Sequence, residues 1–159
     1  LGAASIYIAK KFLEFLDRKP EKFGLAMLFL GLFGALTLLY VMCKPYPMDY
    51  VDGKLLVDPA KMTPDAWGDA GGMVPLAIAW YIEERWVKFE ATGFNVKGVI
   101  LTLIGLAIVA WMTEDLKNIC NASFGRSVGK LAYHFAFFFF VMVIWPIIIK
   151  IFTAQKKEN

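Results

Sequence analysis

The sequence is poor in the side chains on which metal and nucleophilic chemistry depend. His134 is the only histidine, and Cys43 and Cys120 are the only cysteines. A metal centre needs several His, Cys or carboxylate ligands at suitable spacing, and no such cluster occurs. Nucleophilic catalysis needs a base and an orienting group beside the nucleophile, and nothing in the sequence nominates them. We therefore expect no metal, no cofactor and no catalytic residue here, and we expect His134 to be a packed or interfacial side chain.

Other absences exclude further classes of protein. The chain has no glycine-rich phosphate loop and no RNA- or DNA-binding motif, and its net charge is only +3. Cys43 and Cys120 lie in separate segments, so a disulfide is open but not required. No methionine opens the chain, and Leu1 begins inside an apolar pattern that has neither a basic leader nor a cleavage site. This start predicts a truncated first helix, and hence a fragment or a processed chain.

Long apolar runs are what the sequence has in abundance. Hydrophobic residues make up 58% of the chain, above the ~45–50% of soluble domains. One run, 23–43, holds 21 residues without a charge, close to the ~20 needed to cross a bilayer. We expect an all-α, polytopic membrane protein with one helical domain, 1–159, and about five membrane helices. The predicted spans are 1–16 (partial), 23–43, 64–82, 98–113 and 131–149.

Two of these spans carry helix signals of their own. Thr63 is suited to cap the third span, with Pro64 at the first helical position and Asp65 near the positive end of the helix dipole. Its uncharged part is short, and Gly71-Gly72 with Pro75 could break it. In the fifth span Pro146 predicts a kink or the end of the regular helix.

The loops alternate in positive charge. Eleven Lys and Arg residues fall on one side of the predicted topology and six on the other. Because cytoplasmic loops are enriched in Lys and Arg, the start of the chain is predicted outside and the carboxyl end in the cytoplasm. We expect a cell membrane as the location and membrane lipids as partners.

The stretch after the third span, "AWYIEERWVKFE", places aromatic residues against charges. Tyr81 and Trp86 suit the headgroup layer, and Glu83 and Glu84 follow where water begins. One interpretation is a collar at the membrane exit. The alternative is a buried ionisable site for one of the two glutamates, which would be costly and hence functional.

Cations and glycines allow two further interpretations. Lys44, Arg126 and Lys130 fall on the same predicted face and either attract anionic lipid headgroups or are ordinary solvated charges. The glycine pairs Gly68/Gly72 and Gly125/Gly129 have the four-residue spacing that lets helices approach closely in lipid. Packing inside the chain is favoured over dimerisation.

The segment 44–93, "KPYPMDYVDGKLLVDPAKMTPDAWGDAGGMVPLAIAWYIEERWVKFEATG", resembles the carboxyl-terminal membrane half of bacterial PAP2 (type 2 phosphatidic acid phosphatase) superfamily proteins. In that subgroup an Asp/Ala/Gly-rich helix ends in a glutamate-, arginine- and aromatic-rich exit, here 82–89, and two membrane helices follow. The resemblance covers nearly all 159 residues.

The resemblance implies metal-independent hydrolysis of lipid phosphates or pyrophosphates by a histidine nucleophile. The family's motifs, K-x6-RP, PSGH and SR-x5-H-x3-D, are absent, and His134 matches neither histidine motif. No catalytic residue can be carried over. The resemblance therefore implies a non-catalytic scaffold that would accompany an upstream catalytic half. The alternative is a stand-alone accessory subunit, which would have a partner membrane chain, or a small transporter component.

Overall fold

The computed structural model describes residues 2–47, 49–51, 53–56, 58–90 and 96–154. Nearly all of this part is helical. The first half contains α1 (Gly2–Arg18), a short 3-10 turn at Pro20–Lys22, α2 (Phe23–Cys43) and α3 (Pro59–Ile82), which ends in a π-helical turn at Glu83–Val87. Between α2 and α3 lies a small antiparallel hairpin of β1 (Tyr50–Val51) and β2 (Lys54–Leu55).

The second half forms two long helices. α4 (Val96–Trp111) continues through a π-helical turn at Met112–Leu116 into α5 (Lys117–Phe124), and α6 (Arg126–Phe139) continues through Phe140–Ile144 into α7 (Trp145–Ala154). Gly125 joins α5 to α6 with φ +77°, a left-handed conformation that glycine adopts without strain. The expectation of an all-α architecture is therefore confirmed.

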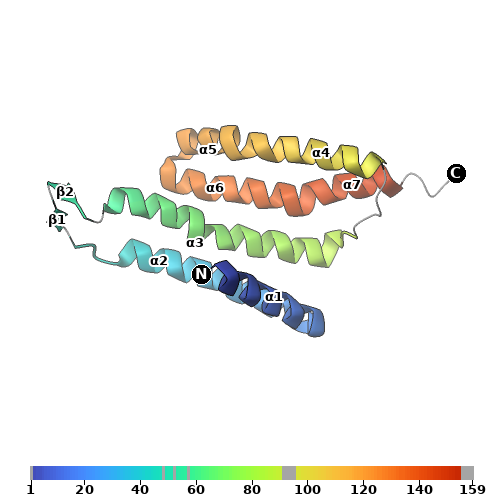
Figure 1. Ribbon diagram of the computed structural model, residues 1–159, viewed down its shortest axis with the longest axis horizontal. Helices are drawn as coiled ribbons and strands as arrows, with labels where there is room; N and C mark the ends of the chain where they lie inside the picture. Colours follow the sequence, from blue (N-terminus) through green and yellow to red (C-terminus); the bar gives the residue numbers. More distant parts are fainter. Residues whose placement is uncertain (1, 48, 52, 57, 91–95, 155–159) are drawn as a thin grey trace.

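The long helices lie side by side in a row (Figure 1). α2 packs on α3, α3 packs on α6, and α5 packs on α6. α3 runs antiparallel to α2 but parallel to α6–α7, because Asp65 faces Lys130 near the start of both helices and Val87 faces Lys150 near their ends. The second half of α1 packs against α2 and α3, where Leu16 contacts Met27 and Ala77. α3 and α6 are thus the inner helices of the row, and α3 also contacts α1.

Three helices are long and apolar enough to cross a membrane, by length and composition: Pro20–Cys43, Val96–Phe124 and Arg126–Phe152. Protein buries only 11%, 11% and 6% of the residues in their most apolar windows. Apolar side chains exposed on this scale call for a nonpolar solvent, because soluble proteins rarely show large contiguous apolar surfaces. In the part of the chain that the structure describes, three such helices are found, fewer than the five expected. α1 has only 17 residues, several of them charged, and α3 contains polar residues and prolines.

α2 has the predicted bounds, but α3 starts earlier than expected. Asp58, not Thr63, is the cap, and its Oδ1 accepts a hydrogen bond from the Ala60 amide at 3.0 Å. Asp58 precedes a proline at the first helical position, the same signal that the sequence offers again at Pro64. Pro64 is accommodated in the second turn, and α3 also continues through Pro75. The helix break considered at Gly71-Gly72 and Pro75 is therefore absent.

The last two predicted spans are shorter than the helices that contain them. The helix over 98–113 extends to Phe124, because Glu114, Asp115 and Lys117 are exposed and stay helical. Pro146 does not end the helix over 131–149, which runs to Ala154. The α geometry does give way to a π-helical turn just before Pro146, where the proline ring crowds the preceding turn.

Candidate functional site

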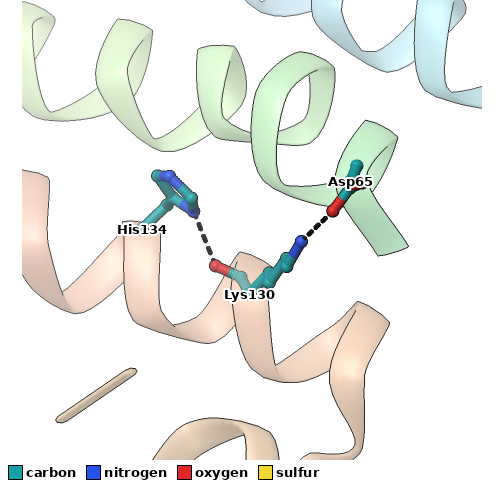
Figure 2. A network of polar contacts seen from close by, with 3 residues as sticks. All are labelled: Asp65, Lys130 and His134. Atoms are coloured by element: carbon teal, nitrogen blue, oxygen red, sulfur yellow. Dashed lines mark hydrogen bonds and ion pairs between the residues drawn. The ribbon is translucent and has the colours of Figure 1, made fainter. Parts of the chain in front are cut away.

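Polar side chains between α3 and α6 form the network drawn in Figure 2. Lys130 Nζ donates a hydrogen bond to Asp65 Oδ1 at 2.5 Å and forms an ion pair with it. His134 Nδ1 lies 2.7 Å from the Lys130 carbonyl oxygen. A carbonyl oxygen can only accept a hydrogen bond. Nδ1 of His134 is therefore protonated, and it donates this hydrogen bond within its own helix. The network joins the two helices through the Lys130 side chain alone.

Glycines on α3 make room for this network. A Cβ atom on Gly68 would lie 3.3 Å from Lys130 Cδ, and one on Gly72 would lie 3.2 Å from His134 Cδ2. The pair therefore faces α6, and packing within the chain is confirmed for it. Gly129 likewise faces α5, because its Cβ would lie 2.5 Å from the Cys120 carbonyl oxygen.

The charges of the network differ in exposure. The Asp65 side chain is 68% exposed and that of Lys130 only 19%. The hydrogen bond from Lys130, together with its positive charge, lowers the pKa of the Asp65 carboxyl, and Arg126 and Lys117 lower it further. Because Asp65 is solvated, the attraction contributes little stability of its own. Its effect is to fix the position of α6 along α3.

A second lysine joins the same two helices at their other end. Lys150 Nζ donates to the Val87 carbonyl oxygen at 2.6 Å and approaches that of Lys88 at 3.5 Å. The last carbonyls of a helix lack partners within the helix and carry partial negative charge, so a lysine stabilises them. Lys88 has φ +46° and ends the helix in a left-handed conformation. The Lys130 and Lys150 contacts therefore hold α3 against α6–α7 at both ends.

The two glutamates after α3 have different surroundings. Glu83 is half-buried, and its Oε1 accepts a hydrogen bond from the Phe89 amide at 3.1 Å. Glu84 is exposed and lines a cavity of about 280 Å³ with Asp17 and Trp80. Protein atoms fully bury neither carboxylate. Beside them Trp86 is exposed and stacks edge to face on Tyr81, with ring centroids 5.9 Å apart.

The three cations predicted to contact anionic lipid are only partly brought together. Arg126 and Lys130 both lie in the first two turns of α6, but Lys130 is engaged by Asp65. Lys44 follows α2, on the other side of α3, with its Nζ 5.8 Å from the Tyr40 ring centroid and 5.9 Å from that of Tyr46. Arg126 is exposed.

Both cysteines are free. Cys43 is exposed at the end of α2, and Cys120 is buried in α5 against α6. α3 and α6 lie between these two helices in Figure 1, so a disulfide would require the row to rearrange.

Sequence reasoning treated Asp65 only as a charge near the start of a helix, and it assigned no role to Lys150. Both act through a neighbour more than sixty positions away in the chain. No local signal reports such a parallel pairing.

The arrangement as a whole connects helices and does not gather reactive groups. Over the ranges that the structure describes, no three His, Cys, Asp or Glu side chains lie close enough together to hold a metal ion. Comparison of the chain with protein-family models, curated proteins and solved structures finds no significant match.

Proposed function

We propose that this chain is the non-catalytic scaffold region of a PAP2-like membrane phosphatase that acts on lipid phosphates or pyrophosphates. The observation that carries the scaffold role is the use of its polar side chains. Lys130 and Lys150 both connect α3 to α6–α7, and His134 donates through Nδ1 to its own helix. Side chains that are engaged in contacts of this kind hold a bundle of helices together.

The assignment to the phosphatase family rests on the resemblance of residues 44–93. The catalytic motifs of that family are absent from these 159 residues, so the proposal assigns the chemistry to an upstream segment or to a partner chain. The transporter alternative loses the feature that favoured it, because α3 is unbroken.

In the proposed membrane arrangement α1 and α3 cross the bilayer together with the three apolar helices. The excess of Lys and Arg in alternate loops supports a start outside and a carboxyl end in the cytoplasm. Glu83, Glu84 and Trp86 then form an exit collar at the cytoplasmic surface. Cysteine-accessibility labelling of Glu84→Cys and Ser123→Cys in sealed bacterial cells tests this arrangement, with the free native cysteines replaced in both variants by Cys43→Ser and Cys120→Ala. Only position 123 should react with a membrane-impermeant reagent.

The decisive experiment measures phosphate release by the chain purified in detergent micelles. Phosphatidic acid and a polyprenyl pyrophosphate are the substrates, an active PAP2 phosphatase is the positive control, and heat-denatured chain is the background. We expect no turnover above background. Clear turnover would contradict the scaffold proposal.

The intact mass of the product in its native source tests the family proposal separately. A longer product that contains the PSGH and SR-x5-H-x3-D motifs supports the phosphatase assignment. A product of 17.9 kDa that is isolated without a partner carrying these motifs contradicts it.

A further inference from the structure

An apolar groove of about 440 Å³ runs between α2 and α3. Its walls come from Met27 and Leu28 on α2 and from Val74 and Ile78 on α3. No residue of α1 lines it, although Leu16 of α1 also packs with Met27 and Ala77. Phe12 of α1 packs on Trp80, two residues after Ile78, and residues two apart point to opposite sides of a helix. The groove is therefore on the face of the α2–α3 pair that α1 leaves free.

Small residues of α2, Gly24, Gly31 and Ala35, line the groove. A Cβ atom on Gly31 would lie 3.7 Å from that of Ala77 on α3, and one on Gly24 would lie 3.3 Å from Tyr81 Cε2. From Gly24 to Ala35 the groove extends roughly 16 Å at 1.5 Å per residue. This length is about half of a ~30 Å hydrocarbon core, so the groove is about as long as one leaflet is thick.

Near Ala35 the two helices come into contact. A Cβ atom on Gly34 would lie 2.5 Å from the Ala70 carbonyl oxygen and 2.7 Å from Met73 Cβ, so the backbones touch there. A transmembrane helix of another protein would need a groove through both leaflets. A single acyl chain of a lipid needs only one.

A cation lies at the open end of the groove. Arg85 follows Val74, Ile78 and Tyr81 at spacings of three and four residues, which places it on the same face of α3 and its terminal turn. The neighbouring carboxylates are directed elsewhere, Glu84 to the cavity at Trp80 and Glu83 to the Phe89 amide. Arg85 is exposed, and no carboxylate within the described ranges pairs with it.

We propose that this groove binds an anionic phospholipid, with one acyl chain between α2 and α3 and the phosphate on Arg85. The guanidinium group offers a planar pair of donors that matches phosphate oxygens. Tyr81 and Trp86 lie at the same end, where aromatic rings favour the headgroup layer. The site does not depend on the phosphatase assignment, because it uses none of the family's motifs.

Photo-crosslinking in vesicles tests the site. The full chain is reconstituted with phosphatidic acid or phosphatidylcholine that carries a diazirine in the acyl chain, and labelled peptides are identified by mass spectrometry. Ala35→Phe fills the groove at its closed end, where the two helices meet. Leu36→Phe is the matched control, because Leu36 is the next residue on α2, is 63% exposed and does not line the groove. Far-UV circular dichroism and thermal melting verify that each variant folds.

We expect phosphatidic acid to label α2 and α3 along the groove. Ala35→Phe should reduce this labelling about fivefold through loss of buried apolar contact, and Leu36→Phe should leave it unchanged. Arg85→Gln should reduce the preference for phosphatidic acid over phosphatidylcholine about fivefold, and Arg18→Gln, in an exposed residue at the end of α1, should not.

Two results would overturn the proposal. These are equal labelling of the two phenylalanine variants and labelling spread evenly over all lipid-facing helices.

Discussion

α2 and α3 lie side by side, yet they reverse the usual relation between polarity and burial. α2 has 21 residues without a charge, and protein buries only Met27 and Gly34 among them. α3 contains Asp65, Asp69 and two internal prolines, and it is the helix with the most buried residues. Its buried positions are occupied mainly by Gly, Ala and Pro.

The difference shows which property of a helix decides whether it lies inside this row or at its edge. In water the apolar helix would be the central one, because burial of apolar surface drives folding. In lipid the tails are as apolar as leucine, and helices associate through close packing and polar contacts. Side-chain size and polar complementarity therefore place α3 inside the row, and α2 can present its leucines and phenylalanines to lipid.

The largest expected effect comes from closing the space between these two helices. Gly34→Ala puts a Cβ 2.5 Å from the Ala70 carbonyl oxygen, so the helices must separate, at a cost of about 2 kcal/mol. Gly31→Ala is the matched control, because its Cβ meets only an ordinary contact at 3.7 Å and gains helix propensity, about 0.5–1 kcal/mol. Unfolding in mixed micelles followed by circular dichroism measures both. Equal stabilities would disprove close packing at Gly34.

A smaller effect is expected at the end of α3. Lys150→Met removes the hydrogen bond to the Val87 carbonyl oxygen, and the free energy of unfolding should fall by about 1 kcal/mol. Lys97→Met removes an exposed lysine near the start of α4 and controls for loss of charge. A value for Lys150→Met as small as that of the control would show that the contact adds nothing.

The Asp65–Lys130 pair should give a small effect that depends on pH. Because Lys130 lowers the pKa of Asp65, the stabilisation is fully present above the ordinary value of 3.8 and is lost as the pH falls below it. Wild type should therefore melt slightly above Asp65→Asn at neutral pH and at the same temperature in strong acid. Asp69→Asn, on the same helix, controls for the loss of one negative charge. A difference that persists in acid strong enough to protonate Asp65 in the folded protein would contradict the pairing.

The smallest effect is expected on the lipid-facing side of α2. Leu36 is 63% exposed, so Leu36→Ala removes little contact with protein and should change stability in micelles by less than about 0.5 kcal/mol. A core leucine loses ~2–5 kcal/mol on the same change. A loss in that range would mean that another protein segment packs against Leu36. α2 would then be as buried as α3, and the contrast between the two helices would be wrong.

The sequence predicted the positions of the helices better than the contacts between them. The bounds of α2 were predictable because 21 uncharged residues admit one interpretation. The start of α3 was not, because Asp58-Pro59 and Thr63-Pro64 give equivalent signals and only the structure shows the first in use. The Lys130–Asp65 and Lys150–Val87 contacts depend on two parallel helices with a shared register, which hydropathy does not encode. Arg85 was predictable as an interfacial charge, but its position above a groove was not.

The separation of the two lysine contacts has a consequence for the thickness of the bilayer. Lys130 and Lys150 are twenty residues apart on one continuous helix, which corresponds to roughly 30 Å, the usual thickness of the hydrocarbon layer. In the proposed membrane arrangement, two ammonium groups at this interval would give the helix pair a set hydrophobic width. In bilayers of graded acyl length the pair should be most stable where the lipid matches this width, and thicker bilayers should draw one ammonium group into the hydrocarbon.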